Sequence, residues 1–303
     1  MQLQRVVIAT DFSAPATDAA IWTARYFAPD AELVLVHTIV IPEPPRFLRG
    51  RFPSTEPLVE TARIGATLKM RELSGLLGAE RVRSEIRVGD AAEEIAQVSN
   101  EYDSDLVVVG QHGERPGVLG RLGSTAEQVI RTSAVPVLLV VGAPDAPPRR
   151  LLVPVDDSDV APVVIGWARF LTARFQANAT AIHVIGPAAF GSLLEMATVG
   201  AGANEPEQGA LRAEVRDEAS QWLTRLVQSD IHREFIETDV AFGELGEEIA
   251  AIAQNMDADL IVMGSHGRKG LRRYLIGSVA GHVLRHAHCP TLVVREPEDD
   301  IVN

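Results

Sequence analysis

The sequence predicts an α/β protein with two doubly wound, five-stranded parallel sheets, one in each half of the chain. Length is the first reason, because 303 residues are about twice a typical single domain. The second reason is that short β-branched runs alternate with helical stretches, five strands with four helices in each half. The apolar runs are continuous, as expected for parallel strands that are covered on both faces.

The second half of the chain repeats the first. A strand ending in Asp-Phe-Ser (11–13) matches a later strand ending in Asp-Asp-Ser (156–158), and each is followed by a helical stretch with one tryptophan, Trp22 or Trp167. The remaining matches join the second, fourth and fifth strands of the two halves, which are 33–37 with 179–183, 105–110 with 259–264, and 135–140 with 289–294.

A proline-rich stretch without strand pattern, 143–149, separates the two copies. We predict that it is a linker between a first domain, 1–142, and a second domain, 150–303. Residues 42–57 and 186–206 are predicted to be irregular insertions before the second helix of each half. They follow the carboxyl end of strand two, where sheets of this kind bind ligands.

Charge and composition narrow the classes of function. The net charge of −13 disfavours nucleic-acid backbones and anionic membranes as partners, because both would be repelled. The single cysteine, Cys289, cannot form an internal disulfide, which fits a reducing compartment. We find no apolar segment near the ~18 residues needed to cross a bilayer, and no signal-peptide core. We therefore expect a soluble, cytoplasmic protein.

A glycine pattern with the spacing G-x2-G-x9-G-S occurs in both halves after strand four. Its first glycine ends a buried strand, and its final Gly-Ser pair opens a helix. Such a loop turns backbone N–H groups inward, and the helix start adds unsatisfied donors and a positive dipole end, so the pattern predicts an anion site for phosphate. The residues concerned are Gly110, Gly113, Gly123 and Ser124 in the first half, and Gly264, Gly267, Gly277 and Ser278 in the second.

Together these motifs resemble the ATP-binding branch of the universal stress proteins, over nearly all of both halves. The resemblance implies an adenine nucleotide alpha-hydrolase-like, Rossmann-like fold with strand order 3-2-1-4-5. It also implies that Asp11 and Asp156 lie beside the adenosine, that Thr38 and Val184 line the adenine slot, and that the glycines and serines hold the phosphates. A divalent ion such as Mg²⁺ often accompanies them in the family. The function implied is an ATP-binding regulator of the stress response.

The two copies of the loop differ in ways that favour the second. There, Arg268 and its neighbour Lys269 supply cations beside the phosphates. In the first copy, Glu114 would repel a polyphosphate and Pro116 removes one N–H donor. We therefore predict the stronger site in the second domain.

Two helix starts carry the spacing of a capping box. In the first, Asp90 precedes Glu93 by three residues, and in the second, Ser124 precedes Glu127. A capping box at Ser124 would occupy its hydroxyl and further weaken the first nucleotide site.

Alternative functions remain open at this stage. A slow Mg²⁺-dependent ATPase could use Asp156 and bound Mg²⁺ to orient water, and an interaction scaffold would bind no nucleotide. We find no nucleophile–base pair or arginine finger, so no catalytic residue is assigned. One interpretation of His282, His286, His288 and Cys289 is a metal-binding cluster. We favour the other, in which the histidines lie near a helix C-terminus and Cys289 begins a buried strand.

Two histidines, His37 and His183, lie on predicted buried strands, where we interpret them as core residues. Trp22 and Trp167 are interpreted as core residues too.

The fifth strand of each half, 137–141 and 291–295, is apolar and lies at the sheet edge in the expected order. An exposed apolar edge invites pairing, so we expect the two edges to pair within one chain as a pseudo-dimer. The eight residues from Gly142 to Arg149 would span up to roughly 28 Å when extended, which permits this pairing. A homodimer and an unidentified protein partner remain open.

Overall fold

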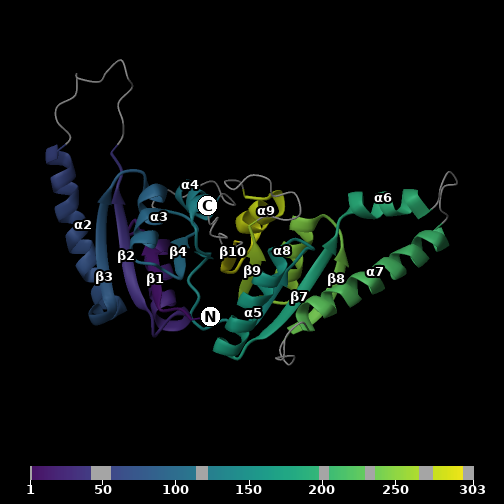
Figure 1. The fold of residues 1–303 in the computed structure, drawn as a ribbon. Coiled ribbons are helices and arrows are strands. Elements are labelled where there is room, and N and C mark those ends of the chain that lie inside the picture. The colour runs from purple at the N-terminus through teal and green to yellow at the C-terminus, as the bar shows by residue number, and fades with distance from the viewer. Residues whose placement is uncertain are drawn as a thin grey trace, which may run out of the picture. The chain divides into compact units, whose positions relative to one another are not determined.

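The computed structural model describes residues 2–41, 56–113, 122–197, 205–228, 236–265 and 276–295. The chain divides into two compact units, Gln2–Pro147 and Pro148–Glu296. We call them the first and the second domain. Each is an open sheet whose strands alternate with helices along the chain (Figure 1). No helix in the described ranges combines the length and the apolar character that a membrane span requires.

The first domain follows the predicted order of five strands and four α-helices. A π-helical turn, Thr23–Phe27, extends its first helix, and a 3₁₀ turn, Ala79–Arg81, precedes its third strand. The main elements are β1 Arg5–Ala9, α1 Ala14–Trp22, β2 Glu32–Ile39, α2 Glu56–Leu77, β3 Val82–Val88, α3 Ala91–Glu101, β4 Leu106–Gly110, α4 Ser124–Thr132 and β5 Val137–Val140.

The second domain has one helix more than predicted. Residues 187–197, expected to be irregular, form α6, because Ala, Leu and Met there favour a helix that Pro187 opens. The elements are β6 Arg150–Pro154, α5 Ala161–Phe175, β7 Asn178–Ile185, α6 Pro187–Ala197, α7 Glu205–Gln228, β8 Ile236–Phe242, α8 Leu245–Asn255, β9 Leu260–Gly264, α9 Ser278–His286 and β10 Thr291–Val294. In the first domain, 42–55 lie outside the described residues.

Strand order confirms the doubly wound prediction in each domain. The order is β3-β2-β1-β4-β5 in the first and β8-β7-β6-β9-β10 in the second, and the pairs within each domain are parallel. Both correspond to 3-2-1-4-5. The strand order reverses between the first strand and the fourth, so the carboxyl ends of β6 and β9 form a switch point where such sheets bind ligands.

Helices cover both faces of the second sheet. Alternate residues of β7 show which helices lie on each face. Ile182 and Val184 pack with α8 and α9 in one apolar cluster. His183, between them, turns to the other face and meets Trp222 of α7 edge-on, with ring centroids 5.1 Å apart. This burial of both faces explains why the apolar runs of the strands are continuous in the sequence.

The predicted caps have different outcomes. Asp90 is the N-cap of α3 and accepts from the backbone N–H groups of Ala92 and Glu93, which confirms the N-cap part of that prediction. The prediction of a capping box at Ser124 is wrong. The N-cap of α4 is Gly123, without a side-chain cap, and Ser124 is the first helical residue. Its hydroxyl is therefore one position too far along the helix to cap it.

The tryptophans occupy the core positions predicted for them, and His37 and His183 are half-buried and hydrogen-bonded. Trp22 and Trp167 are 2% and 6% exposed. His37 Nδ1 donates to the Thr10 carbonyl at 2.8 Å, and His183 Nδ1 donates to the Val155 carbonyl at 2.9 Å. Each histidine thus fastens the end of the first strand to the second strand, directly before the aspartate of the Asp-x-Ser motif.

Cys289 is expected to resist alkylation in the folded protein. Burial raises the pKa of its thiol to about 12, and Asp259 adds to the shift. Because the thiolate is the reactive form and ordinary thiols have a pKa of about 8.5, iodoacetamide at about pH 8 should label Cys289 only after unfolding in urea. Mass spectrometry measures this labelling, and rapid labelling of the native protein would contradict the burial.

The free energy of unfolding should also fall as the pH rises above the ordinary pKa of a thiol, because Cys289 then ionises only in the unfolded chain.

Candidate functional site

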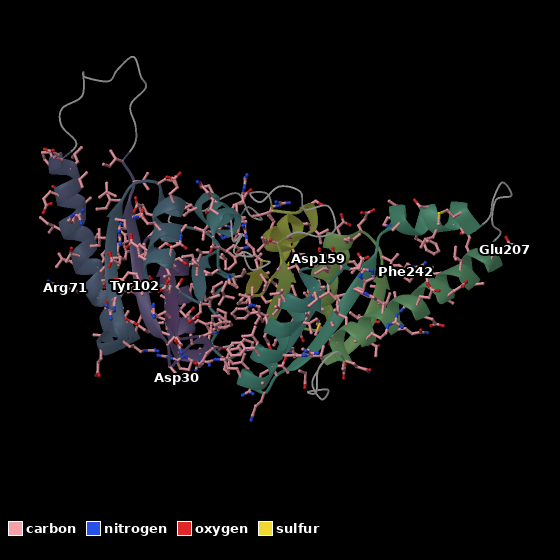
Figure 2. The ribbon with its side chains drawn as sticks, in the orientation of Figure 1. Asp30, Arg71, Tyr102, Asp159, Glu207 and Phe242 are labelled. Carbon is pink, nitrogen blue, oxygen red and sulfur yellow. The ribbon has the colours of Figure 1, made fainter. Side chains whose placement is uncertain are left out.

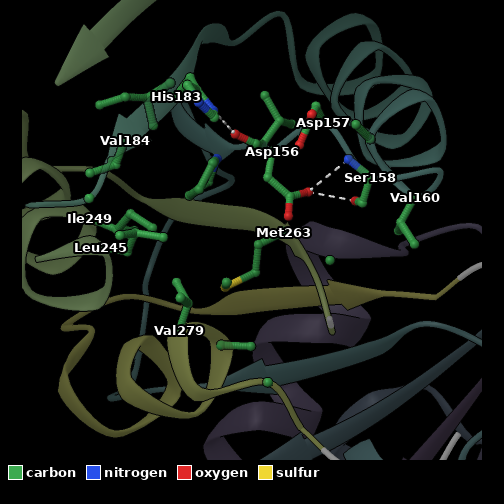
Figure 3. A pocket seen from close by; sticks show the side chains of 18 of the residues that line it. Asp156, Asp157, Ser158, Val160, His183, Val184, Leu245, Ile249, Met263 and Val279 are labelled. Carbon is green, nitrogen blue, oxygen red and sulfur yellow. Dashed lines mark hydrogen bonds between the residues drawn. The ribbon is translucent and has the colours of Figure 1, made fainter. Parts of the chain in front are cut away.

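A cavity of about 970 Å³ opens at the carboxyl ends of β6, β7 and β9 in the second domain (Figure 3). Its walls come from the β6–α5 loop, the end of β7, the first turns of α6 and α8, and the start of α9. This is the switch point of the sheet. A volume of this size is within the range of small-molecule sites, roughly 300–1,000 Å³.

One wall of the cavity is polar and carries Asp156. Its Oδ1 accepts from the backbone N–H of Ser158 at 3.3 Å and from the Ser158 hydroxyl at 2.5 Å. The preceding Val155 donates its N–H to the Ile182 carbonyl and accepts from His183. Asp156 is therefore held on a short, tied loop, and Figure 3 shows its carboxylate near Ser158 and Met263.

The opposite side of the cavity is apolar. Val184 comes from β7 and Met263 from β9, and helical residues complete the surface. Leu245 opens α8 so close to β7 that a Cβ on Gly186 would lie 2.6 Å from its Cδ1. The apolar lining consists of Ile182, Val184, Leu245, Ile249, Met263, Ile276 and Val279. A flat heteroaromatic ring would bury its faces here without leaving a charged group unpaired.

The start of α9 closes the cavity with backbone donors. Gly277 is the N-cap of α9, makes no side-chain cap, and donates its own N–H to the Ser265 carbonyl at 2.9 Å. In the described part of α9, Ser278, Val279 and Ala280 form the first turn, whose N–H groups have no intrahelical acceptor, and the first intrahelical bond runs from Gly281 to Gly277. Three donors and the positive end of the helix dipole thus face the site, which suits an oxyanion.

Most of the residues predicted for the second site line this one cavity. They are Asp156, Val184, Gly264, Gly277 and Ser278. Gly267 and Arg268 lie outside the residues that the structure describes, as do Lys269 and the rest of 266–275.

The first domain builds the same frame around its predicted residues. Gly123 donates to the Gln111 carbonyl at 3.0 Å, as Gly277 does to Ser265, and Ser124 opens α4. Gly110 lies close to α1, and a Cβ there would make a tight contact of 3.3 Å with the backbone of Ala16. Thr38 occupies the place of Val184, and among the described residues its buried hydroxyl has no hydrogen-bond partner.

Asp11 and Gly113 lie close together in the first domain. A Cβ on Gly113 would lie 2.4 Å from Asp11 Oδ2, so the carboxylate lies directly against the glycine loop. Its other oxygen accepts from the Ser13 N–H at 3.0 Å. Glu114 and Pro116, the sequence differences expected to weaken this site, lie outside the described residues.

Several cavity residues were missed at the sequence level. Met263 and Ser265 flank a predicted glycine, so their position next to Gly264 was the available signal. Ala188, Ala189 and Ser192 line the cavity from α6, which was expected to be irregular. Leu245 and Ile249 lie one turn apart on α8 and also line the cavity.

The histidine cluster has a structural arrangement. His282 and His286 stack with centroids 4.1 Å apart, and His286 Nδ1 bonds to the His282 carbonyl. Burial lowers the pKa of His282, and nearby His286 lowers it further. In the described part of the chain, no group of three or more His, Cys, Asp or Glu residues is arranged to hold a metal.

Comparison with known proteins gives the same fold in two copies. The model of the universal stress protein family matches residues 2–141 and again 148–295. The chain belongs to the universal stress protein family. A universal stress protein of Mycolicibacterium smegmatis is 29% identical over 301 residues, covering 96% of both chains. One from Methanocaldococcus jannaschii is 34% identical over 155 residues, which cover 50% of this chain and 85% of that protein.

A solved structure supports the fold. The universal stress protein from Archaeoglobus fulgidus DSM 4304 superposes with a TM-score of 0.68 at 18% identity, covering 97% of this chain and 99% of that one. Tandem universal stress protein domains therefore run through nearly the full chain.

Proposed function

We propose that this universal stress protein binds ATP in the cavity of its second domain. One observation carries the proposal, namely that a single cavity joins an apolar slot, a tied aspartate and a helix start with three available N–H donors. These are the surfaces that the base, the ribose and the phosphates of a nucleotide require.

The residues suggest where each part of the nucleotide would bind. The adenine would lie in the apolar slot beside Val184, and Asp156 would accept a hydrogen bond from the ribose. The phosphates would lie on the first turn of α9, where the Ser278 hydroxyl adds a donor to the backbone groups. Mg²⁺, where present, would be bound by the phosphates and would neutralise part of their charge.

A regulatory role fits these residues better than catalysis. Among the described residues of the cavity wall, the titratable side chains are Asp156, Asp157 and His183. Nδ1 of His183 is committed to the Val155 carbonyl, so the ring has a structural role. We therefore propose an ATP-binding regulator whose nucleotide-bound form is recognised by a partner protein.

Titration calorimetry with ATP and Mg²⁺ tests the proposal. The parent protein should bind ATP, and mass spectrometry of nucleotide released from freshly purified, denatured protein should identify the ligand. Asp156→Asn should weaken binding by about tenfold, because a charged hydrogen bond to the ligand becomes a neutral one. Absence of binding, with no thermal shift on adding ATP, would leave the interaction scaffold as the function.

Release of ADP separates the regulator from a slow ATPase. For a regulator, ADP should form no faster than in buffer with the same Mg²⁺ concentration. A rate above this background that disappears in Asp156→Asn would instead assign hydrolysis to the second domain, in the role expected of a water-orienting carboxylate.

We further propose that the first domain binds ATP more weakly than the second. The support lies in the sequences of the two loops, because Glu114 would repel a phosphate and Pro116 lacks an N–H donor, whereas Arg268 and Lys269 would attract one. The expected titration has one tight and one weak site. Equal occupancy of both at limiting ATP would contradict the proposal.

A further inference from the structure

Two arginines of α7 converge on one aromatic ring in the second domain. The Cζ atoms of Arg212 and Arg216 lie 4.4 Å and 5.4 Å from the ring centroid of Phe242, the last residue of β8. Phe190 of α6 meets the same ring edge-on, with centroids 5.6 Å apart. Figure 2 labels Phe242 beside α7. We call these four residues the arginine–phenylalanine cluster.

The helix places these arginines where apolar residues would be expected. Arg212 and Arg216 share one face of α7 with Leu223 and Val227, which are buried in the core. Towards its N-terminus this face therefore changes from apolar to cationic. Both arginines remain exposed, and their N–H groups can reach a ligand.

The first domain shows that the fold does not need this cluster. Buried Leu73 and Leu77 of α2 correspond to Leu223 and Val227. The same spacing places Ala62 and Ala66 at the positions of the two arginines. Val88, before Gly89, takes the position of Phe242, before Gly243. At the three positions that can be compared, the first domain thus folds with two alanines and a valine where the second has two arginines and a phenylalanine.

No acidic residue of α7 lies one helical turn from either arginine. Residues three or four positions away from them are Gln208, Gly209, Ala213, Val215, Ala219 and Ser220, none of which is acidic. Across the ranges that the structure describes, neither arginine forms an ion pair, although the chain carries a net charge of −13. Two like charges one turn apart repel each other, and an anion between them would remove that repulsion.

We propose that Arg212 and Arg216 form a binding site for a phosphoryl group. Guanidinium groups match the oxygens of phosphate with paired N–H donors, and a phosphate monoester near neutral pH carries close to the two negative charges that two arginines balance. Contact with the Phe242 ring restricts both side chains beforehand, which reduces the entropy lost on binding.

The cluster lies beside the cavity but does not depend on ATP binding there. Phe190 is on the same helix as Ala188 and Ser192, which line the cavity, and Ile185 of the cavity pairs in register with Phe242. The phosphoryl group could therefore come from free phosphate or from a ligand that reaches beyond the cavity, and these two sources are distinguishable.

Arginine side-chain NMR gives a site-specific test. In ¹⁵N-labelled full-length protein, the Nε–H signals of Arg212 and Arg216, assigned from single variants, should shift on titration with inorganic phosphate. Chloride at equal ionic strength should not produce these shifts. Addition of ATP then identifies the source, because ATP shifts the two signals itself if its phosphates reach the site, and otherwise leaves the phosphate titration unchanged.

Variants separate specific binding from general charge. Titration calorimetry with inorganic phosphate compares the variants, because those without Arg212 and Arg216 lack the two Nε–H signals. In R212Q/R216Q, affinity for phosphate should fall by about tenfold for each arginine removed. R71Q/R225Q removes the same charge from two exposed positions and should bind phosphate as the parent does. R212K/R216K retains the charge and should show an intermediate loss. Equal losses in both glutamine variants, or signals that respond to chloride as to phosphate, would overturn the proposal.

Discussion

Ser278→Pro is expected to lower the affinity of the second domain for ATP by about tenfold or more while the domain stays folded. Proline removes the backbone N–H of the first residue of α9 and, with it, the serine hydroxyl. Both donors face the cavity at the place proposed for the phosphates. Loss of two hydrogen bonds to a charged group accounts for the size of the effect.

The local backbone is already suitable for proline. Proline is favoured at the first position of a helix, where its N–H is not needed within the helix. The residue before it must be extended, and Gly277 has φ −59° and ψ 153°. Another helix start in the same chain, α1, already contains Pro15 in its first turn. The unfolding midpoint without nucleotide should therefore change little.

Two controls make this result specific. Ser278→Ala removes only the hydroxyl and should cause a smaller loss, which isolates the contribution of the backbone donor. Ser124→Pro makes the same change at the start of α4, after Gly123 with φ −61° and ψ 139°, and should leave the tight site intact. Calorimetry that finds unchanged tight binding in Ser278→Pro, or a loss in Ser124→Pro instead, would show that the phosphates bind elsewhere.

Trp22→Ala is expected to destabilise the first domain by about 3–5 kcal/mol, the usual cost of removing a buried aromatic side chain. Trp22 is almost fully buried, packs against Phe27 with ring centroids 5.4 Å apart, and donates its indole N–H to the Ala146 carbonyl at 2.8 Å. The change creates a cavity and leaves a carbonyl without its donor.

Trp167→Ala provides the matched comparison in the second domain. Trp167 is also buried and meets Phe170 edge-on at 5.8 Å, so a loss of similar size is expected there. Urea unfolding followed by hydrogen exchange assigns each loss to one domain. ATP should raise the midpoint of the second domain in Trp22→Ala, because binding stabilises only the folded form of the domain that binds it. A cost below about 1 kcal/mol in either variant would contradict the assignment of these residues to the core.

Repetition in the sequence made the fold predictable. Each strand has a partner at the same position in the other half, and the Asp-x-Ser and Gly-Ser motifs mark the same strand ends twice. Buried strands such as Leu106–Gly110 specify their environment by continuous apolar residues, so their assignment does not depend on distant contacts.

The errors arise where local signals compete. Ser124 has the spacing of a cap, yet Gly123 takes the cap position because its N–H is bonded to the Gln111 carbonyl, which fixes where the helix begins. Glycines and prolines around 186–206 suggested a loop, but the run from Pro187 to Ala197 buries part of its apolar side, including Phe190 on Phe242. That contact involves residues 52 positions apart, which no local pattern contains.

A backbone hydrogen bond joins the two ends of each glycine loop, from Gly123 to Gln111 in the first domain and from Gly277 to Ser265 in the second. We call the residues between these bonded ends a cassette. Both cassettes span the same number of residues, and the anchoring bond involves only backbone atoms. The ligand preference of a domain can therefore change by substitution within the cassette, without any change to the sheet that carries it. Exchange of 112–122 with 266–276 would transfer the charge pattern of one domain to the other while keeping both ends in register. After a gene duplication, one domain can therefore acquire a new ligand preference while the other keeps the original one.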